Sequence, residues 1–117
     1  MLAKKNKLDT RLFKETLKAG RSYYFDFFSI KVLKNTSSEN SRVAFVASKK
    51  QFKTAVERNL IRRKGFNIIK NLYKNIAPSY ILIFFLKKEA TQLSFDDFRK
   101  KIFDALKKIG ALQTPSK

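Results

Sequence analysis

Apolar positions along this chain repeat with two spacings: three to four residues, which predicts a helix, and two residues, which predicts a strand. The first helix is predicted to be capped by Asp9 or Thr10 and to end at a stop signal at Gly20. The last helix is predicted from a capping box at Ser94 to Gly110, with apolar positions at helical spacing. The pattern thus places an amphipathic helix near each end of the chain.

Three segments between these helices are predicted to be strands. Residues 23–33 and 42–48 are extended on this pattern, and the polar stretch of residues 35–41 between them predicts a hairpin loop. Residues 80–86 are apolar on both faces, which is typical of a strand in the middle of a sheet or beneath a helix. Pro78 marks a break between this strand and the helix before it.

A long helix predicted from Thr54 to Asn75 has two different sides on a helical wheel. One side is a core stripe made of Ile61, Gly65, Ile68 and Leu72, with Ile69 and Ile76 flanking it. The opposite side gathers Asn59, Arg62, Arg63, Phe66 and Lys70. The order helix, strands, helix, strand, helix predicts one small α+β domain over residues 8–112, between a basic mobile tail at 1–7 and a short tail at 113–117.

The charge of the chain indicates an anionic partner. The 117 residues include 27 Lys or Arg against 9 Asp or Glu, which gives a formal net charge of +18. A domain this small repels itself at such a charge unless a polyanion screens it. Nucleic acid is the first candidate for that polyanion, and an anionic membrane surface is the second.

The residue types that are missing narrow the possible chemistry. The chain has no Cys and no His, which excludes disulfides, Cys/His zinc sites and an acid–base histidine. Its acidic residues are scattered, so we predict no catalytic residue and no metal site on the protein itself. The N-terminus lacks the apolar segment of a signal peptide, and no apolar run is long enough to span a bilayer, so we expect a cytoplasmic protein.

Two basic groups around the start of the central helix are candidate phosphate-binding elements. Arg58, Arg62 and Arg63 lie close together with almost no acidic partner, and arginine suits bidentate contact with phosphate. The turn Ser48–Lys50 can bind a phosphate through ammonium and backbone N–H groups. The alternative for the arginines is an ordinary solvated basic face, and the alternative for the turn is a basic loop without a fixed ligand. Phe66 can either stack on a base or enter the core.

The chain resembles the bacterial ribonuclease P protein family in two adjoining segments, Arg42-Val43-Ala44-Phe45-Val46-Ala47-Ser48-Lys49-Lys50 and Ala55-Val56-Glu57-Arg58-Asn59-Leu60-Ile61-Arg62-Arg63. The family signature has a strand that ends in Ser-Lys-Lys, a short basic spacer, and a helix start that contains Arg-Asn-Arg. Leu60 stands where the family has the second Arg of that triplet, and Ala44 where the family commonly has Gly. The resemblance covers about residues 8 to 112.

The resemblance implies both a fold and an activity. The fold would be a small α+β sandwich, like the second domain of a small-subunit ribosomal protein, with a left-handed βαβ crossover around the signature helix. Sequence physics alone predicts the right-handed crossover. The activity would be removal of the 5′ leader from precursor tRNA by a ribonucleoprotein endonuclease, with the chemistry carried by the RNA and Mg²⁺ held mainly by RNA phosphates. The implied partners are ribonuclease P RNA and precursor tRNA, with no membrane and no obligate protein partner.

Two groups of candidate site residues accompany this resemblance. RNA contacts are expected from Lys49, Lys50, Lys53, Arg58, Asn59, Arg62, Arg63 and Lys70. Asn59 can bond a base edge or a phosphate, or orient a neighbouring arginine. A cleft between the signature helix and the sheet is implied for the single-stranded leader, with candidates Phe13, Leu17, Phe28, Lys31 and Phe66. Ordinary core packing is the alternative for these five side chains.

Three other functions compete with this one. A ribosomal or ribosome-assembly RNA-binding protein shares the charge and the small size but needs no leader cleft. A stand-alone nuclease is disfavoured because the chain lacks His and clustered acids. A membrane-surface protein is disfavoured because the basic residues are spread over several elements rather than one amphipathic helix.

Overall fold

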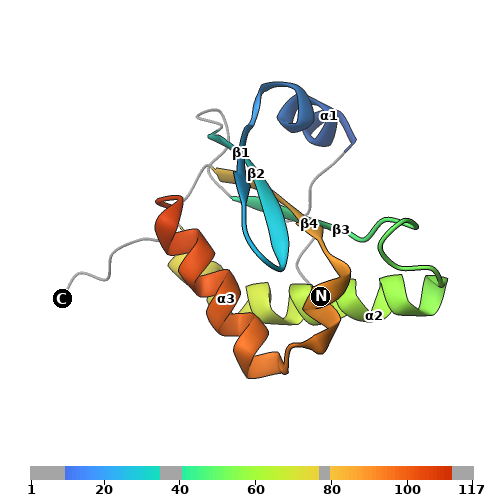
Figure 1. The fold of residues 1–117 in the computed structure, drawn as a ribbon. Helices are drawn as coiled ribbons and strands as arrows, with labels where there is room; N and C mark the ends of the chain where they lie inside the picture. The colour runs from blue at the N-terminus through green and yellow to red at the C-terminus, as the bar shows by residue number, and fades with distance from the viewer. Residues whose placement is uncertain (1–9, 35–40, 77–79, 112–117) are drawn as a thin grey trace.

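The computed structural model of the protein describes residues 10–34, 41–76 and 80–111 (Figure 1). Its helices are α1 (Thr10–Ala19), α2 (Ala55–Leu72) and α3 (Phe95–Lys108), and its strands are β1 (Arg21–Tyr24), β2 (Phe28–Lys34), β3 (Arg42–Val46) and β4 (Tyr80–Leu86). Two short 3-10 helices, η2 (Tyr73–Asn75) and η3 (Lys88–Gln92), follow α2 and β4. The tails predicted at 1–7 and 113–117 lie outside the described residues.

The described strands form one sheet in the order β1-β2-β4-β3. β2 pairs antiparallel with β1 and β4, whereas β3 pairs parallel with β4 through the crossover that α2 supplies. The central place of β4 is the one that its apolar pattern predicted. The hairpin predicted between residues 23–33 and 42–48 is wrong, because β2 and β3 lie on opposite sides of β4. The βαβ unit that the resemblance implies is present, and its left hand stays a prediction.

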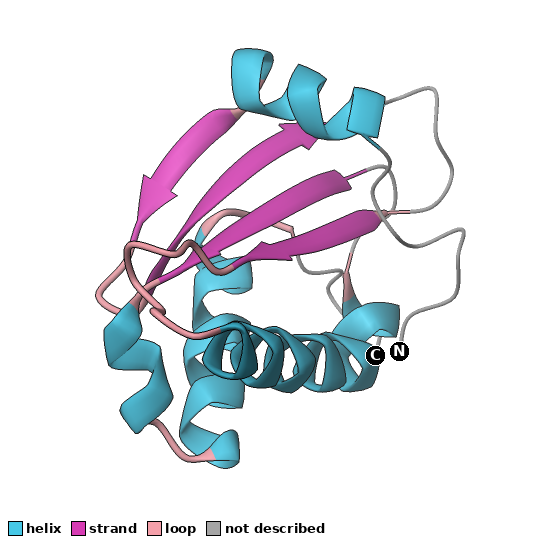
Figure 2. Ribbon diagram, turned by 90° about the vertical axis from the view of Figure 1, so that its right-hand side faces the viewer, coloured by secondary structure: helices cyan, strands magenta, loops and turns pink. Residues whose placement is uncertain are grey.

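α2 and α3 cover one face of the sheet, which we call the inner face (Figures 1 and 2). α2 begins at a capping box in which the Thr54 hydroxyl accepts the Glu57 N–H at 3.1 Å and the Glu57 carboxylate accepts the Thr54 N–H at 3.4 Å. The predicted core stripe of α2 is confirmed, and the flanking Ile69 is buried with it. The strands contribute Phe28, Ile30, Val43, Phe45, Leu82 and Phe84 to the same core, and α3 contributes Phe98, Ile102 and Leu106.

Gly65 brings α2 directly onto the sheet. A Cβ atom at this position would lie 2.7 Å from the ring of Phe45, which itself stacks on Phe84 with ring centroids 4.8 Å apart. Real Cβ atoms do not approach a ring so closely, so only glycine fits here without a shift of the ring. The space between α2 and the sheet is therefore filled by side chains of the core.

α1 lies on the opposite face of the sheet, which we call the outer face (Figure 2). Ile81 and Ile83 of β4 are buried there, as is Thr16 of α1. α1 turns sharply into β1 at Gly20, whose N–H donates to the Thr16 carbonyl at 2.8 Å. β4 is thus covered on both faces, which explains its continuous apolar sequence.

The segment predicted as one extended strand over residues 23–33 is two strands joined by the turn Phe25–Phe27. The Phe25 N–H donates to the Phe28 carbonyl at 2.9 Å and closes the turn. Lys87 holds the turn from outside, because its ammonium donates to the Phe25 carbonyl at 2.9 Å and its N–H to the Phe27 carbonyl at 3.1 Å. The sequence hid this turn, since the Phe-Asp-Phe triplet continues the alternation of apolar and polar residues.

Ser41 joins the start of β3 to the two segments that follow α2. Its side chain is buried, its hydroxyl accepts the Tyr80 N–H at 3.1 Å, and its carbonyl accepts the Tyr73 hydroxyl. Burial raises the pKa of the Tyr73 phenol, and the charge of nearby Arg42 acts in the opposite direction. These bonds fix both ends of the crossover around α2.

Candidate nucleic-acid interface

The connection from β3 to α2 holds three lysines at the surface of a compact turn. The Ser48 carbonyl accepts the Phe52 N–H at 2.9 Å, and the Ser48 hydroxyl accepts the Gln51 N–H at 3.3 Å. The Phe52 side chain is 1% exposed and anchors the turn in the core. The exposed side chains are Lys49, Lys50 and Lys53. The turn leads directly into the N-terminus of α2, where the helix dipole also favours an anion.

Arg58 fastens this turn to α2. Its Nη1 donates to the Phe52 carbonyl at 2.9 Å, and the side chain is half-buried. A guanidinium has five N–H donors, so this bond leaves others that can reach a phosphate. Arg58 therefore has a structural contact that the sequence did not predict, and its contact with RNA stays a prediction.

Asn59 and Arg62 form a pair on the surface of α2. Arg62 Nη2 donates to Asn59 Oδ1, across one turn of the helix. Of the three roles that the sequence left open for Asn59, the structure shows the third, which is to orient a neighbouring arginine. A guanidinium held in place loses less side-chain entropy when it binds a phosphate. Arg63 is exposed next to this pair.

Phe66 belongs to the same surface. A hollow of about 220 Å³ is lined by Asn59, Arg62, Arg63, Phe66 and Asn67. The Phe66 ring also meets Phe45 edge-on, with centroids 5.0 Å apart at 76°, so it packs on the core and lines the hollow at once. An aromatic wall beside two guanidinium groups suits an unpaired base next to its phosphate. Lys70 is exposed one turn further along α2.

We call the residues of this turn and of this side of α2 the basic face: Lys49, Lys50, Lys53, Arg58, Asn59, Arg62, Arg63, Phe66 and Lys70. Glu57 is the acidic residue within this stretch, and its carboxylate caps the backbone of Thr54. No ion pair joins a cation of the basic face to another residue in the described part of the chain. The positive charges of the basic face are therefore available to an anionic partner.

Leu60 lies on the other flank of α2, toward α3. It is 57% exposed and lines a second hollow, of about 270 Å³, with Glu57, Ile61, Lys64 and Thr91. Lys64 marks this flank as the α3 side, because its ammonium donates to the Leu93 carbonyl at 2.7 Å. The departure from the family pattern at Leu60 therefore removes a charge from the α3 side and leaves the Arg62–Phe66 flank intact.

The five residues predicted for the leader cleft divide among three places: Phe13, Leu17 and Lys31 lie on the outer face, Phe28 in the core and Phe66 on the basic face. Phe28 is 1% exposed and lies in the core of the inner face, and Phe66 lies on the basic face. Lys31 lies three residues after Phe28 in β2, and residues three apart on a strand point to opposite faces, so Lys31 lies on the outer face. Phe13 and Leu17 of α1 are half-buried and 39% exposed, respectively. The Phe45 ring fills the space between α2 and the sheet at Gly65, and the position of a leader cleft stays a prediction.

The outer face holds an apolar surface that the sequence analysis missed. Paired register puts Tyr24, Ser29, Phe85 and Val46 side by side across the four strands, and we call this set the outer row. Tyr24 is 78% exposed and the other three are half-buried. The sequence of β4 contains a signal for this surface, because Ile81, Ile83 and Phe85 alternate along the strand and make its second face apolar as well.

The described residues contain no group of three or more carboxylates that could hold a metal ion. None of the described helices is long and apolar enough to cross a bilayer. The chemistry that this part of the chain offers is thus positive charge, aromatic surface and hydrogen-bond donors. Together, the α+β fold and the basic face define an RNA-binding protein.

The family model for ribonuclease P matches residues 2–110 of the chain. The chain is 33% identical to the ribonuclease P protein component of Clostridioides difficile, over 82% of this chain and 83% of that protein. It is 30% identical to the ribonuclease P protein component of Mycoplasma genitalium, over 86% of this chain and 77% of that protein. The chain therefore belongs to the ribonuclease P protein family.

Solved structures agree with this assignment at the level of the fold. The Staphylococcus aureus RNase P protein superposes with a TM-score of 0.79 at 21% identity, over 91% of this chain and 95% of that one. The RNase P protein from Thermotoga maritima superposes with a TM-score of 0.77 at 23% identity, over 87% of this chain and 96% of that one. The small α+β fold implied by the resemblance is thus confirmed.

Proposed function

We propose that this chain is the protein subunit of ribonuclease P and binds the RNA subunit of that enzyme through the basic face. The observation that carries the proposal is the arrangement around Arg62, where Asn59 holds the guanidinium beside Arg63 and the Phe66 hollow. The lysine turn extends this surface past the N-terminus of α2. All of these cations lack an acidic partner among the described residues, so a polyanion is the fitting ligand.

We further propose that the RNA carries the chemistry of leader removal. The described residues supply neither a histidine nor a carboxylate cluster, so they do not fit a metal centre built on protein alone. Mg²⁺ held by RNA phosphates would supply the metal-assisted hydrolysis. The protein would contribute phosphate contacts, and through them a lower requirement for screening cations.

The leader of precursor tRNA is proposed to bind the outer face rather than a cleft beside α2. Lys31 and Leu17 are partly exposed there, and Phe13 is half-buried. The outer row adds the exposed ring of Tyr24 and the half-buried ring of Phe85. Aromatic side chains bind successive bases of a single strand by stacking, at about 1–3 kcal/mol per base. A substrate strand on this face would leave the basic face free for the RNA subunit.

A reconstitution assay tests the proposed function. The purified protein is mixed with a bacterial ribonuclease P RNA and a precursor tRNA that carries a 5′ leader, at a Mg²⁺ concentration where the RNA alone is nearly inactive. Protein-dependent release of the leader, with none from protein alone, would support both the cofactor role and an RNA catalyst. It would also show that no further protein is needed.

Two other results would overturn parts of the proposal. Tight RNA binding without stimulation would favour the alternative, a ribosomal or ribosome-assembly protein. Cleavage by RNA-free protein would favour a nuclease. A cytoplasmic location belongs to the same proposal, and cell fractionation with an epitope on the chain would test it.

A further inference from the structure

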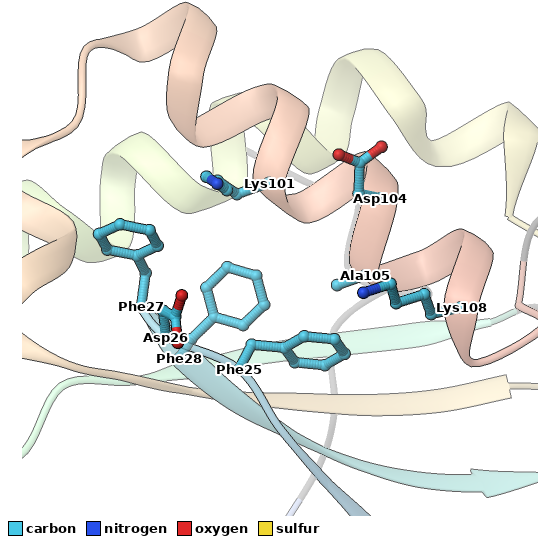
Figure 3. A pocket seen from close by; sticks show the side chains of 8 residues that line it. All are labelled: Phe25, Asp26, Phe27, Phe28, Lys101, Asp104, Ala105 and Lys108. Carbon is cyan, nitrogen blue, oxygen red and sulfur yellow. The ribbon is translucent and has the colours of Figure 1, made fainter.

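A cavity of about 160 Å³ lies between the β1–β2 turn and α3, on the inner side of the sheet (Figure 3). We call it the turn cavity. Its lining consists of Phe25, Asp26, Phe27, Phe28, Lys101, Asp104, Ala105 and Lys108. None of these residues belongs to the basic face or to the outer row. The proposed function therefore leaves this cavity without a role.

The walls of the turn cavity are unusually aromatic for a tight turn. Short turns are normally built from Gly, Asn, Asp, Ser and Pro, whereas this one places Phe25 and Phe27 on either side of Asp26. Both rings are half-buried rather than enclosed in the core. The Phe25 ring centroid lies 5.6 Å from that of Phe28, which forms the floor. Both rings thus keep part of their surface exposed in the wall of the cavity.

The turn is held in place before any ligand arrives. Lys87 donates to the carbonyls of both Phe25 and Phe27, and the Phe25 N–H closes the turn on Phe28. The ammonium of Lys101 lies 5.4 Å from the Phe27 ring centroid, which fixes this lysine at the mouth of the cavity. A preformed pocket loses little entropy when it binds a ligand.

The charges at the turn cavity are balanced, unlike those of the basic face. Lys101, Asp104 and Lys108 come from α3, and Asp26 comes from the turn; the carboxylate of Asp104 points away from the rings (Figure 3). All four side chains are exposed, and none forms an ion pair or hydrogen bond with another described residue. On a chain of net charge +18, a site for bare phosphate would need no carboxylates. The carboxylate of Asp26 instead points to a ligand that carries N–H donors as well as negative charge.

We propose that the turn cavity binds one unpaired nucleotide of an RNA partner, with a base that carries an exocyclic amino group (cytosine, adenine or guanine) against the aromatic wall formed by Phe25 and Phe27. Asp26 accepts the exocyclic amino group, and Lys101 and Lys108 bind the phosphate. Carboxylates accept hydrogen bonds from the cytosine amino group, and proteins recognise unpaired RNA bases by stacking them on aromatic side chains. Uracil presents a carbonyl oxygen where cytosine presents an amino group, so Asp26 disfavours it. The identity of the polymer rests on the RNA partner proposed above.

The pocket itself is tested with mononucleotides. The full chain, labelled with ¹⁵N, is titrated with cytidine, adenosine and uridine 5′-monophosphates while its amide resonances are followed. We expect cytidine and adenosine monophosphates to shift the amides of residues 25–28 and 101–108, and uridine monophosphate to bind about fivefold more weakly. Shifts confined to α2 would overturn the proposal, because they would report general anion binding.

Neighbouring lysines of α3 supply a matched control. Lys101→Glu should weaken cytidine monophosphate binding by about tenfold, because it removes the cation and adds a repelling charge at the cavity mouth. Lys100→Glu makes the same charge change one residue away and outside the cavity lining, so it should bind as the wild type does. Both side chains are exposed, so both variants should fold. Equal losses in the two variants would overturn the proposal.

The role of the carboxylate is tested by base preference. Asp26→Asn offers an amide that donates as well as accepts, so uridine monophosphate should approach cytidine monophosphate in affinity. Unchanged discrimination between the two nucleotides would remove Asp26 from the recognition and overturn that part of the proposal. Asp26 is exposed in the turn, and circular dichroism of the variant checks that the fold is kept.

Filter binding then identifies which RNA supplies the nucleotide. Weaker binding of Lys101→Glu, but not of Lys100→Glu, to the ribonuclease P RNA alone would assign the nucleotide to the RNA subunit. A loss seen only when precursor tRNA binds the assembled complex would assign it to the substrate. No loss in either case would overturn the RNA partner. The basic-face variant Arg62→Ala with Arg63→Ala tests the proposed function separately, because it leaves mononucleotide binding to the turn cavity intact.

Discussion

The double role of Arg58 can be separated by substitution. Its guanidinium donates to the Phe52 carbonyl at 2.9 Å from a half-buried position. A hydrogen bond to a charged group contributes about 1.5–3 kcal/mol, so Arg58→Ala should lower the free energy of unfolding by about 2 kcal/mol. For a domain of this size, that loss corresponds to roughly 8 °C in Tm. Urea unfolding followed by circular dichroism measures the free energy, and a thermal scan measures Tm.

Two further variants separate the structural role from the charge. Arg63→Ala removes an exposed cation without a described partner, so its free energy of unfolding should stay within about 0.5 kcal/mol of the wild type. Arg58→Lys keeps the charge but loses the planar group that reaches Phe52, so it should restore the salt dependence of RNA binding but not the stability. If Arg58→Ala is as stable as Arg63→Ala, the bond to Phe52 does not hold the turn, and the reasoning is refuted.

Changes at Gly65, at Arg62 together with Arg63, and at Leu60 test the core and the interface. Gly65→Ala should lower the free energy of unfolding, because overpacking against Phe45 costs about 1–3 kcal/mol while the higher helix propensity of alanine returns about 1 kcal/mol. Adding Phe45→Leu to this variant should recover part of the lost stability, and a Gly65→Ala variant more stable than the wild type would contradict the close approach of α2 to Phe45. Arg62→Ala with Arg63→Ala should reduce the slope of log affinity against log salt by roughly 1.4–1.8, and an unchanged slope in a folded variant would count against the basic face. Leu60→Arg should raise that slope by about 0.7–0.9 if the RNA reaches the α3 side of α2, and no change would confine the RNA to the Arg62 flank.

Much of the architecture could be predicted from local patterns. The core stripe of α2, the Ser94 cap of α3 and the central place of β4 all follow from spacing and capping residues. The basic face was equally readable, because helical periodicity alone puts Arg62, Arg63 and Phe66 on one side. The predicted hairpin failed because pairing partners are chosen by the whole sheet, and the polar residues 35–41 are compatible with either a hairpin or a longer connection.

The sequence by itself determined the class of this protein: its charge, its lack of histidine and cysteine, and its signature segments identify an RNA-binding member of the ribonuclease P protein family. Only the tertiary structure decided which face each aromatic side chain serves. Phe28 went to the core and Tyr24 and Phe85 to the outer face, because the turn at Phe25–Phe27 and the register with β4 set the orientation of each strand. Such contacts join residues far apart in the chain, so no local pattern encodes them.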